Sequence, residues 1–215
     1  MPIFDNNISL NKRKLRNTLR SARTHAAKNL AHKAHKNLSH QIMKLRAFRM
    51  SKRLAIYLPI NSEFPTTAIL QKGILFKKNI YIPRIISNRN KKMQFSTLYD
   101  NKKHKSKPNL SKNIYGILEP KSKTVNQIII PQAIDIIFMP LLGFNSKGDR
   151  LGMGGGYYDR ALWFKRNKKP QLRPYLIGLA YEAQLNNNIL ADTWDVTLDA
   201  VITEQSIYYF NSALL

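Results

Sequence analysis

The chain has no cysteine, few acidic residues and no long apolar run, and each absence excludes a class of protein. Without cysteine it forms no disulfide, iron–sulfur cluster or thiolate zinc site, which suits a reducing compartment. No stretch approaches the ~20 apolar residues of a membrane-spanning helix. Residues 1–7 also lack the apolar core of a signal peptide. We therefore expect a soluble, cytoplasmic protein without a membrane partner.

The length and the apolar fraction fit one folded domain. A chain of 215 residues with 43% hydrophobic residues can bury one good core. No internal repeat is visible. We expect a single domain over 1–215, with residues 1–50 as a helical N-terminal segment packing on a sheet, and a monomer.

The scarcity of acidic residues leaves a formal net charge of +24. Residues 1–53 hold fourteen Lys and Arg against one acid, whereas residues 124–215 hold eight bases and eight acids. One alternative is a basic nucleic-acid-binding protein that uses residues 1–53. Lys, Asn and Ile share A/T-rich codons, however, so a biased genome explains the excess equally well. Because the chain has no recognised RNA-binding motif, we do not expect a nucleic-acid partner. A basic surface would also attract anionic substrates such as ATP or a polyglutamate tail.

Apolar periodicity predicts an α/β fold. Spacings of three and four predict one or two amphipathic helices over 8–48, with Arg20 and Arg23 on the solvated face, and a further helix over 66–76. Short apolar runs predict strands at 54–58, 80–82, 93–98, 134–139, 176–180 and, as the last strand, 200–203. The basic segment 100–113 is expected to be an exposed loop. Continuous apolar strands alternating with helices indicate a three-layer sandwich, whose mostly parallel or mixed central sheet is covered by helices on both faces.

The most informative stretch is 143–160, in which four of the five residues 152–156 are glycine. Glycine permits φ > 0 and close approach of a ligand, so bare amides can curl around phosphate oxygens. A flexible linker is the alternative, but the interleaved Leu151, Met153 and Tyr157 need burial or a ligand. Neither the P-loop nor the dinucleotide fingerprint is present. We expect the loop just past the central strand 134–139, with a helix from 158 to 164 directing its N-terminal amides at the phosphates.

Several motifs together resemble one family, the 5-formyltetrahydrofolate cyclo-ligases, also called 5,10-methenyltetrahydrofolate synthetases. They are Lys-Arg-Lys-Leu-Arg at 12–16, Tyr-Leu-Pro at 57–59 followed by Glu63 and Thr66, Gly-Ile-Leu-Glu-Pro at 116–120, the segment 140–160, and Trp-Asp-Val-Thr-Leu-Asp at 194–199 before 201–203. The resemblance implies ATP-dependent cyclisation of 5-formyltetrahydrofolate to 5,10-methenyltetrahydrofolate. The formyl oxygen would be phosphorylated, ADP and phosphate would be released, and Mg²⁺ would accompany ATP. A nucleotide-binding relative with an altered substrate stays open as a second alternative.

The resemblance also assigns roles to residues. Lys12 and Arg16 would hold ATP phosphates, with Lys12 and Arg150 as the catalytic residues. The ATP-binding segment would comprise Arg150, Leu151, Gly152, Met153, Gly154, Gly155, Gly156, Tyr157 and Tyr158. The folate would contact Leu58, Glu63, Met153, Gly154, Gly155, Gly156 and Tyr157.

The metal site would use two carboxylates, Asp159 and Asp195, and Asp199 is close enough in sequence to be the second ligand instead of Asp195. Each assignment has a structural alternative. Asp159 could cap the following helix or pair with Arg160, and Lys12 and Arg16 could be exposed helix charges. Trp194 is interpreted as structural, and no histidine is assigned a catalytic role.

Overall fold

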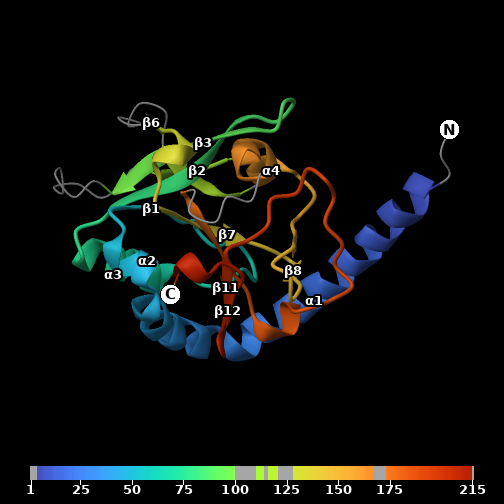
Figure 1. Ribbon diagram of the computed structural model, residues 1–215, viewed down its shortest axis with the longest axis horizontal. Coiled ribbons are helices and arrows are strands. Elements are labelled where there is room, and N and C mark those ends of the chain that lie inside the picture. The colour runs from blue at the N-terminus through green and yellow to red at the C-terminus, as the bar shows by residue number, and fades with distance from the viewer. Residues whose placement is uncertain (1–3, 100–109, 114–115, 121–127, 167–172, 215) are drawn as a thin grey trace.

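A mixed sheet forms the centre of the computed structural model, which describes residues 4–99, 110–113, 116–120, 128–166 and 173–214 (Figure 1). Within these residues the sheet has eight strands in the order β12-β11-β10-β7-β1-β2-β3-β6. Their bounds are β1 Arg53–Ala55, β2 Asn79–Ser87, β3 Lys92–Tyr99, β6 Ile128–Ile129, β7 Ile136–Pro140, β10 Tyr175–Leu179, β11 Ala200–Ile202 and β12 Ile207–Tyr209. The five strands from β11 to β2 run parallel to one another, whereas the pairs β11–β12, β2–β3 and β3–β6 are antiparallel. The predicted mixed, mostly parallel sheet is therefore confirmed.

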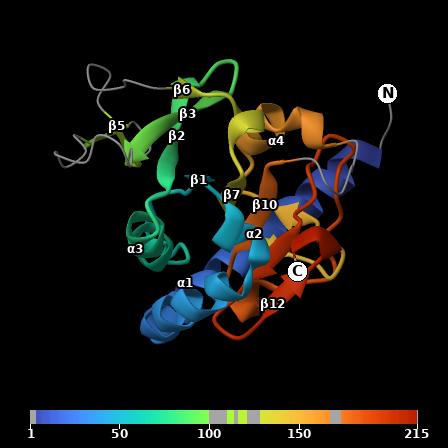
Figure 2. The same ribbon diagram turned by 60° about the vertical axis from the view of Figure 1, so that its left-hand side comes forward.

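Long helices cover one face of this sheet. α1 (Phe4–Lys44) is a single helix of 41 residues, followed by α2 (Arg46–Met50), and α3 (Thr67–Leu75) confirms the helix predicted over 66–76. Alternate strand residues, such as Ile136 and Phe138 of β7, share a core with Leu38 and Ile42 of α1. Figure 2 shows α1 and α3 lying together beneath the sheet.

The opposite face is covered by shorter elements. They are the hairpin β8 (Gly143–Phe144) and β9 (Arg150–Leu151), the helix α4 (Tyr157–Ala161) and the 3₁₀ turn η3 (Trp163–Lys165). The other strand residues face this layer: Ile137 and Met139 of β7 pack with Phe144 and Leu162. The predicted cover on both faces is confirmed, although the second layer contains little helix.

Two predictions about the strands were incomplete. The strand at 200–203 is not the last, because β12 follows it as a short, partly exposed edge strand. β2 also continues through Pro83 to Ser87, although proline usually ends a strand. It can do so because β1 pairs only with 79–81, which leaves that side of β2 without a ladder partner at Pro83. β5 (Leu118–Pro120), which pairs with β4 (Leu110–Lys112), supplies Glu119 there as acceptor for the Ile85 amide at 2.9 Å.

Two expectations from composition concern other parts of the chain. In the segment 100–113, residues 100–109 lie outside the described residues, and the described 110–112 form β4. Across the described ranges, every helix is too short or too polar to cross a lipid bilayer.

Candidate functional site

The glycine segment, residues 152–156, joins β9 to α4. It does not follow the central strand directly, as predicted, because the β8–β9 hairpin stands between β7 and the glycines. α4 has only five residues, shorter than the helix predicted over 158–164, and ends where Leu162 takes a non-helical ψ of 20°. Because so short a helix has a small dipole, positive charge for phosphates has to come mainly from side chains.

The glycine segment is open to solvent. Met153 and Gly154 are exposed, and Gly154 and Gly156 have φ of +95° and +65°, a left-handed conformation that favours glycine. Among the described residues, the backbone amides of 153–156 donate no hydrogen bond. The amides are therefore available to a ligand.

Helix α1 brings two predicted phosphate ligands to this segment. Arg16 Nε donates to the Gly152 carbonyl at 3.2 Å, and Lys12 Nζ forms an ion pair with Asp192 at 2.6 Å. Both side chains are on one face of α1, since residues four apart are one turn apart. They are half-buried contacts between distant segments rather than freely solvated helix charges.

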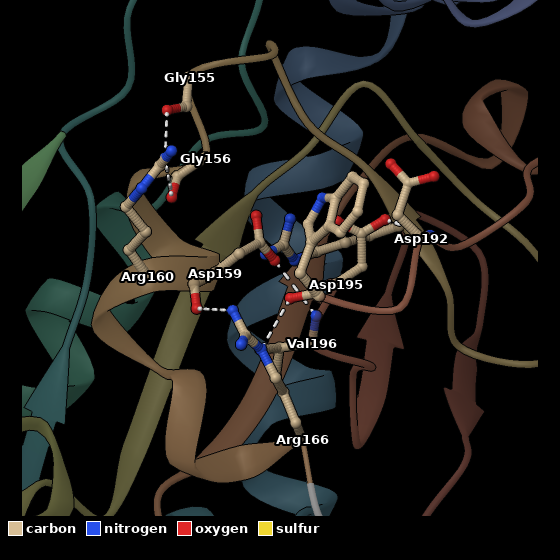
Figure 3. A network of polar contacts seen from close by, with 10 residues as sticks. Gly155, Gly156, Asp159, Arg160, Arg166, Asp192, Asp195 and Val196 are labelled. Atoms are coloured by element: carbon tan, nitrogen blue, oxygen red, sulfur yellow. Dashed lines mark hydrogen bonds and ion pairs between the residues drawn. The ribbon is translucent and has the colours of Figure 1, made fainter. Parts of the chain in front are cut away.

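Arg150 and Asp159 form a buried ion pair behind the glycine segment. Arg150 Nη2 lies 2.5 Å from Asp159 Oδ1, which also accepts the Val196 amide at 3.2 Å. Arg160 does not pair with Asp159; its guanidinium donates to the carbonyls of Gly155 and Gly156 at 3.5 and 3.4 Å (Figure 3). The buried pair fixes Asp159 in place and ties β9, α4 and the chain at Val196 together.

A second acidic group lies beside this pair. The acidic segment, residues 192–196, closes on itself, because the Asp192 amide donates to Asp195 Oδ2 at 2.9 Å and the Asp195 amide donates to the Asp192 carbonyl at 3.0 Å. Burial raises the pKa of Asp195, the negative charges of Asp159 and Asp192 raise it further, and Lys12 opposes them. The four charged groups therefore share one neighbourhood.

The carboxylates Asp159 and Asp195 have the donor chemistry for Mg²⁺. This ion keeps several waters and needs only one or two protein carboxylates. On each residue one oxygen accepts an amide, and the other has no partner within the described part of the chain. No group of three or more metal-ligating side chains occurs among the described residues.

Asp199, the alternative to Asp195, is used elsewhere. Its two oxygens accept the Leu176 amide and the Asn211 side-chain amide, each at 2.7 Å, and Lys165 Nζ lies 3.6 Å away. It stands just before β11, at the amino end of the parallel strands. Both oxygens of Asp199 are thus occupied by contacts that hold the sheet together, so the geometry favours Asp195 as the partner of Asp159.

Glu63 lies in the loop after β1, where a buried arginine faces it. Its carboxylate accepts the Ile60 amide at 3.0 Å; burial raises the pKa of Glu63, and Arg23 partly opposes this rise. Burial also raises the pKa of Tyr57 and of Tyr158, and the charge of Glu63 raises both further. Glu63 is therefore close to Tyr158 of α4, next to the glycine segment.

The prediction that Arg23 is solvated was wrong, whereas Arg20 is exposed as expected. Arg23 is 3% exposed and donates to Ser62 Oγ at 3.2 Å and, more weakly, to the Leu141 carbonyl at 3.5 Å. A signal was present in the sequence. Arg23 shares the helix face of the buried residues Leu19 and Ala26, at spacings of four and three.

Two residues predicted to contact folate, Tyr157 and Leu58, contact other parts of the protein in this structure. The Tyr157 hydroxyl donates to Asn88 Oδ1 at 2.9 Å, and Lys91 Nζ stands 5.6 Å from the centre of its ring, so Tyr157 touches the β2–β3 turn. Leu58 packs partly buried against the core beneath α1. Their folate contacts stay predictions.

The fold and these groups define a class of protein: an α/β protein whose exposed glycine segment is surrounded by cationic side chains and paired carboxylates. Comparison with known proteins narrows this class. The model of the 5-formyltetrahydrofolate cyclo-ligase family matches residues 8–204, so the chain belongs to that family of enzymes, and the resemblance seen in the sequence is confirmed.

Relatives agree with this membership. A Haemophilus influenzae 5-formyltetrahydrofolate cyclo-ligase is 31% identical over 87% of this chain and 94% of its own length. The fold is similar to Aquifex aeolicus 5,10-methenyltetrahydrofolate synthetase, with a TM-score of 0.73 at 24% identity over 93% of this chain and 92% of that one. It is also similar to a Mycoplasma pneumoniae 5,10-methenyltetrahydrofolate synthetase, with a TM-score of 0.64 at 26% identity over 90% of this chain and 99% of that one.

Proposed function

We propose that this protein converts 5-formyltetrahydrofolate to 5,10-methenyltetrahydrofolate and uses ATP, releasing ADP and phosphate. One observation carries the proposal beyond family membership. Residues far apart in sequence, in α1, β9, α4 and the acidic segment, converge on an open glycine segment. The arrangement suits a triphosphate, which needs amide donors, cationic side chains and a metal-binding carboxylate pair.

The ATP end is formed by the glycine segment and α1. The free amides of 153–156 would donate hydrogen bonds to phosphate oxygens. Arg16 contacts the Gly152 carbonyl, so its positive charge lies beside these amides. Lys12 is held by Asp192, which presets its position, and would share its charge with a bound phosphate. Arg150 acts behind the site, because its buried guanidinium fixes Asp159.

The folate end is formed by the loop after β1. Glu63 would accept hydrogen bonds from the pterin N–H groups in its ionised form, with Tyr158 beside it. Arg23 keeps the loop in place through Ser62 and helps to keep Glu63 charged. Glu63 and Arg150 both influence the pKa of Tyr158, which supports a folate end that lies near the phosphate end.

The chemistry asks the protein for positioning and charge rather than for a nucleophile. The formyl carbon is a poor electrophile because the N-formyl amide is resonance-stabilised, and its oxygen is a poor leaving group until it is phosphorylated. In the first step it attacks the γ-phosphorus of ATP; a new P–O bond forms, the bond to the β–γ bridging oxygen breaks, and ADP leaves. In the second step the neighbouring folate N–H nitrogen attacks the activated carbon. The C–O bond breaks, the proton of that nitrogen passes to the departing phosphate or to water, and phosphate leaves as the ring closes. Lys12 and Arg16 would stabilise the charge on the transferred group.

Asp159 and Asp195 would hold Mg²⁺, which when bound neutralises negative charge on the phosphates. Asp195→Asn tests this role, because asparagine keeps the acceptor for the Asp192 amide and removes the charge. We expect the variant to need several-fold more Mg²⁺ for half-maximal rate. An unchanged requirement would return Asp195 to a purely structural role.

Incubation of the purified protein with 5-formyltetrahydrofolate and Mg-ATP tests the proposed function. Product is followed by the near-ultraviolet absorbance of the methenyl compound, and ADP and phosphate are counted against it, with one of each expected per product. Reactions without ATP, or with an analogue whose β–γ bridge is not cleaved, should give no product. No absorbance change in the complete mixture would sink the proposal, and product formed without ATP would refute its ATP dependence.

A further inference from the structure

Both tryptophans of the chain are largely exposed, and one of them stands beside the glycine segment. Trp194 is 57% exposed and Trp163 63% exposed, and the sequence contains no other tryptophan. Single exposed apolar residues are common. Trp194 differs because it belongs to the acidic segment, which the rest of the site holds in place.

Three contacts fix the backbone around Trp194. Asp192 is paired with Lys12, and Arg166 Nε donates to the carbonyl of Trp194 itself at 3.0 Å. The Val196 amide donates to Asp159 (Figure 3). An exposed indole on a fixed backbone loses little conformational freedom when a ligand docks on it. The expected structural role is therefore carried by the backbone, and the ring is left available.

The same contacts place the acidic segment next to the glycine segment. Lys12 holds one and Arg16 the other, and four residues of α1 span only ~6 Å. On the other side, Asp159 links Arg150, just before the glycines, to Val196, just after the indole. Trp194 thus lies within reach of a group attached to phosphates on the glycine segment.

We propose that Trp194 stacks on the adenine ring of ATP, an inference that rests on the proposed function. A purine base is a flat π surface, and an indole is the largest aromatic face that a protein offers. Met153, which is 48% exposed within the glycine segment, offers a polarisable thioether to the same base. Trp194 binds the base and takes no part in phosphoryl transfer.

The test compares a nucleotide with its phosphates alone. Binding of Mg-ATP and of inorganic tripolyphosphate is measured by calorimetry for the unmodified protein and for Trp194→Ala, Trp194→Phe and Trp163→Ala. Loss of one base–aromatic stack weakens binding roughly tenfold. We expect that loss for ATP in Trp194→Ala, unchanged tripolyphosphate binding, and most of the ATP affinity retained in Trp194→Phe. Trp163→Ala, whose ring instead contacts Phe164, should bind both ligands normally.

A spectroscopic arm covers the case in which Trp194→Ala folds poorly. In Trp163→Phe, Trp194 is the sole indole, and ATP should quench its fluorescence whereas tripolyphosphate should not. Three results would overturn the stacking and leave the proposed function standing. They are equal weakening of ATP and tripolyphosphate binding in Trp194→Ala, unchanged ATP binding in Trp194→Ala, or weaker ATP binding in Trp163→Ala alone. If the unmodified protein binds no ATP, the stacking and the proposed ATP dependence fall together, whatever the variants do.

Discussion

Replacing Arg23 by methionine removes a buried charge from α1 while keeping a side chain of similar length. Arg23 is 3% exposed, and its guanidinium donates to Ser62 Oγ at 3.2 Å and interacts electrostatically with Glu63. In the variant, Ser62 loses the guanidinium donor and keeps only its contact with the Thr24 hydroxyl, and Glu63 loses the positive charge that lowers its pKa. The loop after β1 should therefore be less firmly attached to the helix.

The magnitude follows from these contacts. A hydrogen bond to a charged group contributes about 1.5–3 kcal/mol. The second bond, to the Leu141 carbonyl, is 3.5 Å long and adds little. Burial lowers the pKa of Arg23, which shows that the charge is costly to bury, so the loss should not exceed this range. We expect the free energy of unfolding to fall by about 2 kcal/mol, and the melting temperature to fall by roughly 4–8 °C.

The loss should also depend on pH. The folded pKa of Glu63 is raised above its ordinary value of 4.5, so protonated Glu63 favours the folded state, and this contribution is lost as pH rises through the folded pKa. Removing Arg23 raises that pKa further. The destabilisation should therefore be larger at about pH 7.5 than at about pH 4.5, because a larger share of Glu63 is charged at the higher pH.

Urea unfolding at both pH values measures these effects. Arg20→Met is the matched control, because Arg20 is exposed on the same helix and its loss should cost less than about 0.5 kcal/mol. An Arg23→Met protein as stable as Arg20→Met would refute the buried role. Destabilisation that is equal at the two pH values would refute the coupling to Glu63 alone.

Three further predictions concern the site. Lys12→Ala should raise the KM for ATP several-fold in steady-state kinetics, whereas the control variant Lys14→Ala, which changes an exposed lysine nearby, should leave that KM unchanged. Equal effects of the two variants would make Lys12 an ordinary surface charge. Glu63→Gln should raise the KM for folate tenfold or more, where each factor of ten corresponds to roughly 1.4 kcal/mol, and should leave the ATP affinity measured by calorimetry unchanged. Weaker binding of both folate and ATP would contradict the assignment of Glu63 to the pterin. Gly143→Ala should lower the free energy of unfolding by about 1–3 kcal/mol, because the new Cβ would lie 2.5 Å from a methyl group of the buried Leu19 in α1. In the control Gly152→Ala the nearest atom is 3.6 Å from the new Cβ, so this variant should unfold like the unmodified protein in thermal scans.

Local pattern was enough to predict much of the architecture. The runs at 134–139 and 176–180 correspond to β7 (Ile136–Pro140) and β10 (Tyr175–Leu179), and the spacing over 66–76 to α3. Such central elements carry strong signals because both faces of a covered strand must be apolar. The edge strand β12 has three partly exposed residues and pairs on one side, so its sequence carries almost no signal.

The candidate site divides in the same way. The sequence by itself determined the family and the identity of the glycine segment, since motifs such as Gly-Met-Gly-Gly-Gly are contiguous and depend on backbone freedom. Only the tertiary structure decided which charges meet: Arg150 with Asp159, Lys12 with Asp192, and Arg23 beside Glu63. An arginine has the same local pattern whether it faces water or the core. Its environment is set by residues that folding brings from elsewhere in the chain, and for Arg23 that environment includes a carbonyl 118 positions away.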